Sequence, residues 1–238
     1  MNAQPNDALV PDSSAAKTCS LADAITRRRS VRGFLPEPVP RELLHEIFTL
    51  AQQAPSNCNV QPWHVFVGSG VALRCLRDKL VDAVVSGQQP TLDFARTEQF
   101  EGIMRKRQIE TAVELYGNMN IARGDKEGRA RAALRNYEFF DAPHAAFIFM
   151  PKQFGETVAL DVGMYAQTLM LTFTAYGIGS CAQVSISRYP NVVREHFQVD
   201  AGLGLLMAIS FGYEDVAVPA NKTRVPRAPI NEEVRFVS

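Results

Sequence analysis

The 238-residue sequence has no surplus of charge of either sign, because 25 basic and 25 acidic side chains sum to zero. Proteins that bind nucleic acid normally carry a basic surplus, and segments that bind anionic membranes carry clusters of Lys and Arg. The balance therefore argues against both kinds of partner. Hydrophobic residues make up 46% of the chain, which is an ordinary share for a globular protein.

The sequence also lacks metal-binding and disulfide patterns. Its four cysteines form no CxxC pair, and its four histidines show neither HxxxH nor HxH spacing. We therefore expect no metal site, and we expect reduced thiols in a cytoplasmic protein. The first twenty residues hold no apolar stretch of the kind found in signal peptides. We expect residues 1–19 to be a disordered tail.

Motifs for nucleotide phosphates and for nucleophilic catalysis are missing as well. There is no GxxxxGK[ST] and no GxSxG, and the GxGxxG-like run that starts at Gly68 has Leu73 in its sixth position. The uncharged segment 162–187 is interrupted by Gly177 and Gly179, and its helical part, about 162–176, is too short to cross a bilayer. An all-round apolar helix of this kind is expected in a core or a subunit interface.

Periodicity predicts an α+β protein in which helices flank a mixed or antiparallel sheet. We expect a single domain over residues 20–238, with a charged lid inserted at about 90–137, since residues 96–135 carry nine basic and six acidic side chains. Residues 216–238 contain three prolines and no core periodicity, which is typical of an extended arm. The expected helices span 20–29, 42–53, 71–85 and 162–176, and the expected strands span 64–68, 145–150, 181–185 and 205–212.

Three groups of polar residues stand out. Residues 27–32 hold four arginines and Ser30, and residues 222–224 add Lys222 and Arg224. Arginine forks and serine hydroxyls bind phosphate oxygens, although a solvated basic turn has the same composition. The loop 54–63 holds a serine, two asparagines, a glutamine and the only tryptophan. Its amides suit the polar edge of a planar heterocycle, but a proline- and asparagine-rich turn also explains them.

Together these groups resemble the FMN-dependent nitroreductase family. The resemblance rests on the run from Arg28 to Arg32 with Phe34, on Ala54-Pro55-Ser56 through Gln61-Pro62-Trp63, and on the segments 177–181 and 222–226. It covers about residues 20–227. The run 135–143 further resembles members that act on nitroaromatic compounds.

The resemblance implies an intertwined homodimer with two FMN molecules at the subunit interface. FMN would be reduced by NADPH or NADH, and would then reduce a small aromatic or otherwise electrophilic acceptor, such as a nitroaromatic compound or a quinone, in ping-pong two-electron steps. The flavin carries this chemistry, so no catalytic side chain is expected. Tyr116 in the lid is a candidate substrate contact.

By the same resemblance, Arg28, Arg29 and Ser30 hold the FMN phosphate with Lys222 and Arg224, and Arg32 lies near the flavin pyrimidine edge. The arginine run leaves open whether Arg27 or Arg28 is the main phosphate contact. The remaining cofactor contacts are Pro55, Ser56, Asn57 and Asn59 from the other subunit, and Cys181, Ala182 and Gln183. The alternatives are a flavin carrier or sensor without turnover, a relative that uses reduced flavin for dehalogenation, and a basic interaction module without flavin.

Overall fold

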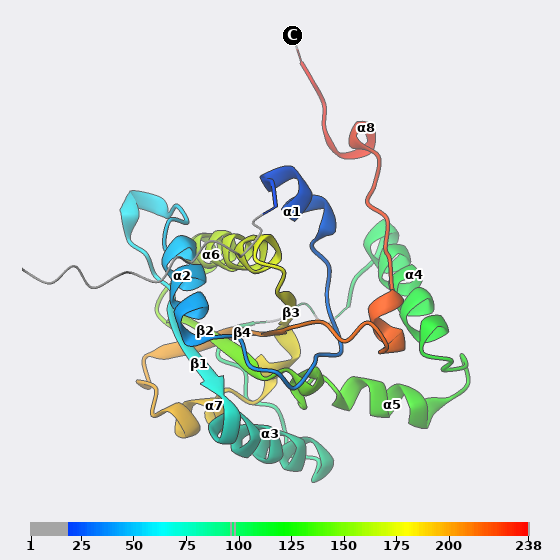
Figure 1. The fold of residues 1–238 in the computed structure, drawn as a ribbon, viewed down its shortest axis with the longest axis horizontal. Coiled ribbons are helices and arrows are strands. Elements are labelled where there is room, and N and C mark those ends of the chain that lie inside the picture. Colours follow the sequence, from blue (N-terminus) through cyan, green and yellow to red (C-terminus); the bar gives the residue numbers. More distant parts are fainter. Residues whose placement is uncertain (1–18, 96, 98, 238) are drawn as a thin grey trace, which may run out of the picture.

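A computed structural model describes residues 19–95, 97 and 99–237. The expected tail therefore lies almost wholly outside the described residues. Within them the protein is an α+β sandwich around one four-stranded antiparallel sheet, with strand order β1-β2-β4-β3 (Figure 1). The strands are β1 (His64–Ser69), β2 (His144–Pro151), β3 (Gly179–Gln183) and β4 (Leu203–Gly212).

The central strand β2 shows why the sheet is buried on both faces. Ala145, Phe147 and Phe149 point into the apolar cluster on one face. Their neighbours Ala146 and Ile148 point into the cluster on the other face. Successive side chains of a strand alternate between faces, so a continuous apolar run predicts a strand with a core on each side. The expected central strand at 145–150 is confirmed, extended by one residue at each end.

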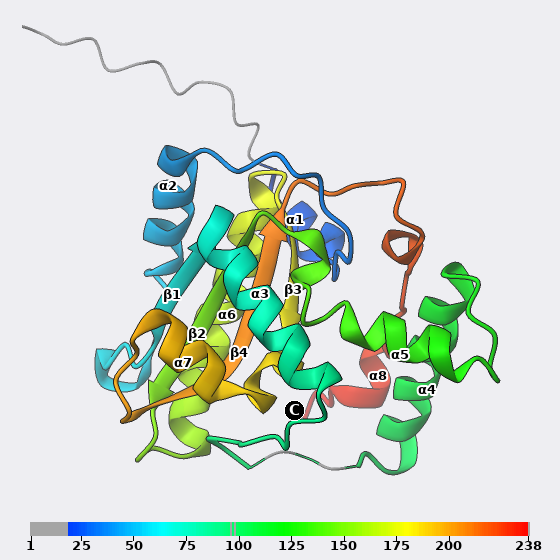
Figure 2. The ribbon, with the colours of Figure 1, turned by 90° about the horizontal axis from the view of Figure 1, so that it is seen from below.

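Helices cover the two faces (Figures 1 and 2). α2 (Arg41–Ala51) and α6 (Glu156–Ala175) pack together on one face, and α1 (Leu21–Arg27) packs on α6. α3 (Gly70–Val85) and α7 (Pro190–Phe197) pack on the other face. The expected helices α1, α2 and α3 are confirmed with small shifts of their ends. The Ser20 side chain accepts a hydrogen bond from the Asp23 N–H, as expected of an N-cap.

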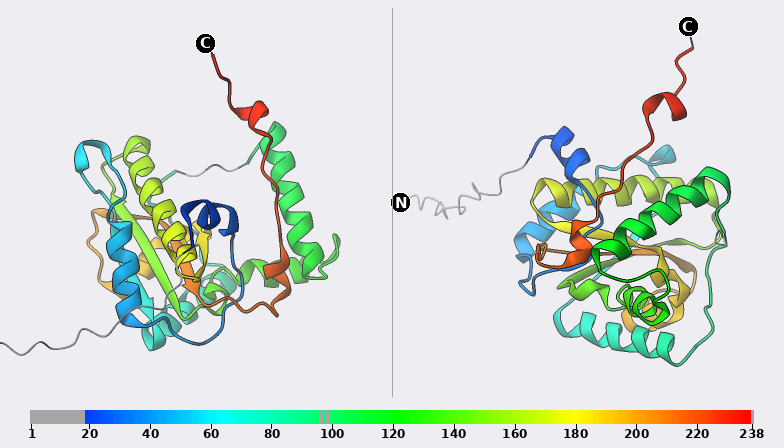
Figure 3. Two further views of the ribbon diagram at one scale, coloured as in Figure 1. Left: turned by 45° about the horizontal axis from the view of Figure 1, so that its top comes forward. Right: turned by 90° about the vertical axis from the view of Figure 1, so that its right-hand side faces the viewer.

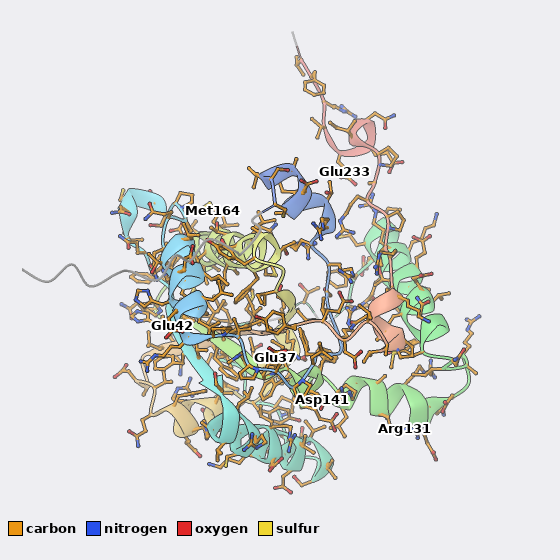
Figure 4. All side chains as sticks on the ribbon, viewed as in Figure 1. Glu37, Glu42, Arg131, Asp141, Met164 and Glu233 are labelled. Carbon is orange, nitrogen blue, oxygen red and sulfur yellow. The ribbon has the colours of Figure 1, made fainter. Side chains whose placement is uncertain are left out.

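α6 differs from the expected helix in two ways. It begins at Glu156, six residues before the expected start. It is also not buried all round, since Leu160 is 69% exposed and Met164 is 39% exposed. Met164 is labelled on the side of α6 away from the sheet in Figure 4. The apolar composition predicted a helix that packs against other protein surfaces. It did not indicate whether these surfaces belong to the same chain or to a second one. Among the described residues, no helix is long and apolar enough to cross a membrane.

The charged stretch forms two helices beside the sheet, α4 (Gly102–Asn118) and α5 (Lys126–Leu134) (Figures 1 and 3). α4 packs on η4 (Pro219–Lys222), a short 3₁₀ helix in the C-terminal segment. That segment also contains α8 (Ile230–Glu233), so the expected extended arm includes two helical turns. The other 3₁₀ helices are η1 (Asn57–Asn59), η2 (Phe139–Asp141) and η3 (Val184–Arg188).

Candidate functional site

The arginine segment that follows α1 lies along the edge strand β3. Ser30 forms an isolated parallel bridge with Ser180, and the Val31 N–H donates to the Ser180 carbonyl over 3.0 Å. The segment then runs beside the residues that follow β4, where the Leu35 N–H donates to the Tyr213 carbonyl over 2.8 Å. These backbone bonds fix Arg28, Ser30 and Arg32 at one edge of the sheet.

The neighbouring arginines of this segment have different surroundings. Arg27 is exposed. Arg29 forms an ion pair with Glu214, so its guanidinium already has a carboxylate partner. Arg28 has no ion-pair partner in the part of the chain that the structure describes. Burial lowers the pKa of Arg28, and the nearby Arg227 lowers it further. Arg28 is therefore the cation of the run that gains most from an anionic ligand.

Behind this cluster lies the Cys181 thiol of β3. Burial raises the pKa of Cys181, although Arg32, a Ser30 hydrogen bond and Arg28 act in the opposite direction. Cys181 is 3% exposed, and its raised pKa disfavours the thiolate, which is the nucleophilic form of cysteine. Ala182 is exposed. Both ends of the Gln183 amide are hydrogen-bonded, since its Nε2 donates to the Asn136 carbonyl over 2.6 Å and its Oε1 accepts from the Ser210 hydroxyl.

Asn221, which the sequence did not single out, joins the arginine segment to the C-terminal segment. Its Oδ1 accepts from the Arg32 N–H over 2.6 Å. Its Nδ2 donates to the carbonyls of Gly33 and Asp215 over 2.9 and 2.8 Å. The Arg224 guanidinium donates to the Asn221 carbonyl over 2.8 Å. No sequence pattern marks this residue, because its partners at 32 and 33 lie almost 190 positions away.

The residues gathered here fit a phosphate group. Among the described residues, Arg28, Arg32, Lys222 and Arg224 have no carboxylate partner, and Lys222 and Arg224 are exposed. Two buried hydroxyls, those of Ser180 and Thr223, also have no hydrogen-bond partner within the described residues. Buried polar groups are normally satisfied. Unpaired cations beside orphaned donors are the environment that an oxygen-rich anion completes.

Among the described residues, the asparagine loop, residues 54–63, contacts α6 and not the basic cluster of its own chain. The Asn57 N–H lies 3.2 Å from each carboxylate oxygen of the buried Asp161 on α6. The Ser56 hydroxyl accepts from the Gln61 N–H over 2.9 Å. Cys58, Asn59 and Gln61 all have positive φ, so the loop is tightly coiled. Pro55, Asn57 and Asn59 are exposed, so their side chains are available to a ligand or a second molecule.

Within one chain the loop and the arginine cluster lie at opposite ends of α6 (Figures 1 and 3). Asp161 holds the loop near the start of α6, and the β3 residues next to the cluster follow its last residue, Ala175. At 1.5 Å per residue, the 14 residues between these positions span about 21 Å. One chain therefore does not bring the two groups of expected cofactor contacts together.

A cavity of about 290 Å³ lies beside Arg32 and is lined in part by residues of α4 and α5. Tyr116, the expected substrate contact, is part of its wall. Most of the wall is apolar or aromatic, which suits a ring-shaped ligand. The other lining residues are Leu115, Met119, Ala132, Ala133, Arg135, Asn136, Phe140, Val218, Pro219 and Ala220.

The α+β fold carries a basic cluster at the edge of its sheet, and comparison with known proteins places the chain in a family. The Nitroreductase family model matches residues 25–213, so the chain belongs to the nitroreductase family. It is 41% identical over 235 residues to nitroreductase NfnB of Mycolicibacterium smegmatis, a match that covers 95% of this chain and 98% of that protein. It is 33% identical to a 4-nitrobenzoate reductase of Pseudomonas putida over 85% of this chain and 89% of that protein.

Solved structures agree with the fold. The FMN-dependent nitroreductase NfnB from Mycobacterium smegmatis in complex with NADPH superimposes with a TM-score of 0.88, at 41% identity, over 91% of this chain and 97% of that one. The FMN- and NADPH-dependent NfnB from Sphingopyxis sp. strain HMH superimposes with a TM-score of 0.89, at 31% identity, over 92% of this chain and all of that one. The expected family and α+β fold are confirmed.

Proposed function

We propose that this protein is an FMN-dependent oxidoreductase that uses NAD(P)H to reduce nitroaromatic compounds. The observation that carries the proposal is the cluster of carboxylate-free cations at the edge of β3, formed by residues about 190 positions apart in a chain of zero net charge. The similarity to FMN- and NADPH-dependent nitroreductases over nearly the whole chain supports it.

Arg28 and Ser30 would hold the FMN phosphate together with Lys222 and Arg224. Arg29 has a different part in this proposal, because its guanidinium is paired with Glu214. It ties the arginine segment to the residues after β4. Arg32 would face the flavin pyrimidine edge, where a cation stabilises the negative charge of the reduced ring. Bound FMN supplies two-electron transfer between a nicotinamide and a nitro group.

The second half of the cofactor site would come from a partner subunit. A shallow apolar groove on α6 is lined by residues that include Pro55, Leu160, Gly163 and Met164. Two copies that pack α6 on α6 in antiparallel orientation would cover this groove. The same packing would bring the loop 55–59 of one copy to the arginine cluster of the other. Pro55, Ser56, Asn57 and Asn59 would then line the flavin of the partner, in a homodimer with two sites.

The cavity beside Arg32 is the proposed place for the ring of the acceptor. Tyr116, Met119 and Phe140 form apolar walls. Arg32 also lines the cavity and is at the same time a member of the basic cluster. Cys181 and Ala182 would pass behind the flavin, with Gln183 supporting that strand. We also propose a cytoplasmic location, which the four free cysteines support.

The test is to purify the full chain and follow its flavin without oxygen. We expect yellow protein whose flavin absorbance is lost on addition of NADPH or NADH and returns on addition of a nitroaromatic compound. Protein that binds FMN but does not react with either nicotinamide would instead be a flavin carrier or sensor. Colourless protein that FMN does not reconstitute would contradict both readings and leave a basic interaction module.

A further inference from the structure

Asn221 contacts both halves of the basic cluster, the Arg32 N–H in the arginine segment and the Arg224 guanidinium in the C-terminal segment. We infer that Asn221 is a positioning residue of the cofactor site, which holds Arg32 and Arg224 in register for FMN. This inference rests on the proposed function. Asn221 lies between Ala220 and Lys222 in η4 and is 4% exposed. Its side-chain polar atoms are bonded to neighbouring backbone groups, so we expect it to act through these neighbours.

Only an amide can make the observed set of side-chain bonds. The Oδ1 acceptor is used by the Arg32 N–H, and the two hydrogens of Nδ2 are used by the carbonyls of Gly33 and Asp215. An aspartate keeps the acceptor for Arg32 but turns repulsive toward both carbonyls. An alanine loses all three bonds and leaves the Arg32 N–H without its Asn221 acceptor, whereas the Gly33 carbonyl keeps its bond from the Asp215 N–H.

The backbone of Asn221 also contacts Arg224, one of the proposed phosphate-binding residues. Its N–H donates to the Val218 carbonyl over 3.0 Å, which closes η4. Its carbonyl accepts from Arg224, whose guanidinium also donates to the Thr223 carbonyl over 2.9 Å. The position of Asn221 therefore sets the direction of the Arg224 side chain. Arg32 and Arg224, from opposite ends of the sequence, share one buried anchor.

The first measurement is the Kd for FMN of the full-length protein, followed by quenching of flavin fluorescence. We expect Asn221→Ala to raise this Kd about tenfold or more, a change of about 1.4 kcal/mol or more. Asn221→Asp, which has nearly the same volume and keeps one of the three bonds, provides a second variant if the alanine variant does not fold. We expect Asn221→Asp to raise the Kd in the same direction. An FMN affinity equal to that of the unchanged protein in either folded variant would overturn the inference.

The second measurement distinguishes positioning from a general loss of stability. In a double-mutant cycle with Arg224→Ala, Asn221→Ala should lose part of its effect on the FMN Kd, because the Arg224 guanidinium is gone while the loss of the Arg32 N–H contact remains. An equal factor in both backgrounds would overturn the inference. Val193→Ala removes a fully buried side chain of α7, on the face of the sheet opposite α6. This control should lower Tm and leave the FMN Kd unchanged.

The outcomes also separate this inference from the proposed function. If the unchanged protein binds no FMN, both fail together. If it binds FMN and its Asn221 variants bind FMN equally well, only the positioning role fails. If the variants lose affinity while Val193→Ala, with a comparable drop in Tm, does not, the loss comes from the anchor and not from weaker folding.

Discussion

The neighbouring arginines at 27–29 show how one residue type serves different purposes within a single turn. Arg27 is exposed, Arg29 is paired with Glu214, and Arg28 lacks a carboxylate partner among the described residues. Burial and the charge of Arg227 both lower the pKa of Arg28. A bound phosphate would relieve that repulsion, whereas the same phosphate would offer Arg29 little that Glu214 does not already provide.

A comparison of two adjacent alanine variants tests the assignment. We expect Arg28→Ala to weaken FMN binding by roughly 10- to 100-fold, because a hydrogen bond to a charged group contributes about 1.5–3 kcal/mol. Arg27→Ala removes the same charge from the exposed side of the same helix end and is the matched control. It should change the FMN Kd by no more than about threefold. A larger loss for Arg27→Ala than for Arg28→Ala would reverse the assignment.

The surroundings of Arg135 lead to an expectation about substrate charge. Arg135 lines the cavity, but its Nη1 and Nη2 donate to Glu138 and Asp141 over 2.7 and 2.6 Å. Burial lowers its pKa, but the hydrogen bonds that it donates to Asp141 and Glu138 and the negative charges of these carboxylates outweigh burial, so the pKa is raised overall. A cation held by two carboxylates offers little to the carboxylate of a substrate.

We therefore expect a higher kcat/KM for nitrobenzene than for 4-nitrobenzoate. The double variant Glu138→Gln with Asp141→Asn should narrow that ratio, by about tenfold if one charged hydrogen bond is gained. Glu127→Gln, which removes an exposed carboxylate next to Arg131 on α5, is the control and should leave the ratio unchanged. A preference of the unchanged protein for 4-nitrobenzoate would contradict the expectation.

His144 gives the protein a pH-dependent contribution to stability. Its Nε2 accepts from the Val39 N–H over 2.9 Å, so the neutral ring is the form that fits, and burial lowers its pKa. As the pH falls through about 6.5, the unfolded chain takes up the proton before the folded chain does. The free energy of unfolding should therefore fall with pH below about 6.5 and be constant, as far as His144 contributes, above it.

Urea unfolding between pH 5 and 8 measures this slope. His144→Phe should flatten it, whatever its effect on stability at neutral pH. His196 contributes in the same direction, because burial and Lys79 lower its pKa, so some slope should persist. His64→Gln replaces an exposed histidine and is the control. A slope that His144→Phe leaves unchanged would show that the ring is not the titrating group.

At the scale of elements, the sequence predicted what local periodicity encodes. The continuous apolar run of β2 specifies a strand that is buried on both faces, and the 3.6-residue spacing in α2 and α3 specifies a helix and its buried face. The arginine run and the asparagine loop could be singled out because each is contiguous. Asn221, Glu214 and Asp161 could not, because their partners lie more than a hundred positions away. Such contacts exist only after the sheet has joined distant segments.

At this scale, α6 is notable for an exposed apolar face. Leu160 and Met164 lie on one side of the helix, four residues apart, next to the small residue Gly163. In the proposed dimer, Leu160→Glu with Met164→Glu would bury two charges at the interface. We expect this variant to be monomeric by light scattering and to lose bound FMN, with its circular dichroism unchanged.

The control for this variant is Val85→Glu, at the exposed end of α3 on the opposite face of the sheet, where Val85 is 70% exposed. It adds a charge at an equally exposed apolar position and should keep both the dimer and the flavin. A dimeric Leu160→Glu, Met164→Glu variant would place the interface elsewhere. A monomeric variant that retains FMN would contradict the shared site.

At the scale of the whole molecule, zero net charge conceals a strongly asymmetric distribution. Carboxylates balance the lysines and arginines in number, yet among the described residues Arg28, Arg32 and Arg224 have no carboxylate partner, while Arg135 and Arg29 are paired. Local charge therefore depends on which distant segments the fold brings together, and composition alone does not reveal it. The same holds for the site, whose two halves lie about 21 Å apart along α6 in one chain.

This separation leads to a test by complementation. A chain with Arg28→Ala and Arg224→Ala lacks the phosphate half, and a chain with Ser56→Trp and Asn57→Trp has a blocked loop half. Each variant alone should bind little FMN. In a twofold dimer with shared sites, a mixed dimer contains one site with both halves intact. Random mixing on coexpression should thus restore about a quarter of the flavin sites of the unchanged protein. If each site lay within a single chain, no mixture would restore any flavin, because every chain would still carry a defective half.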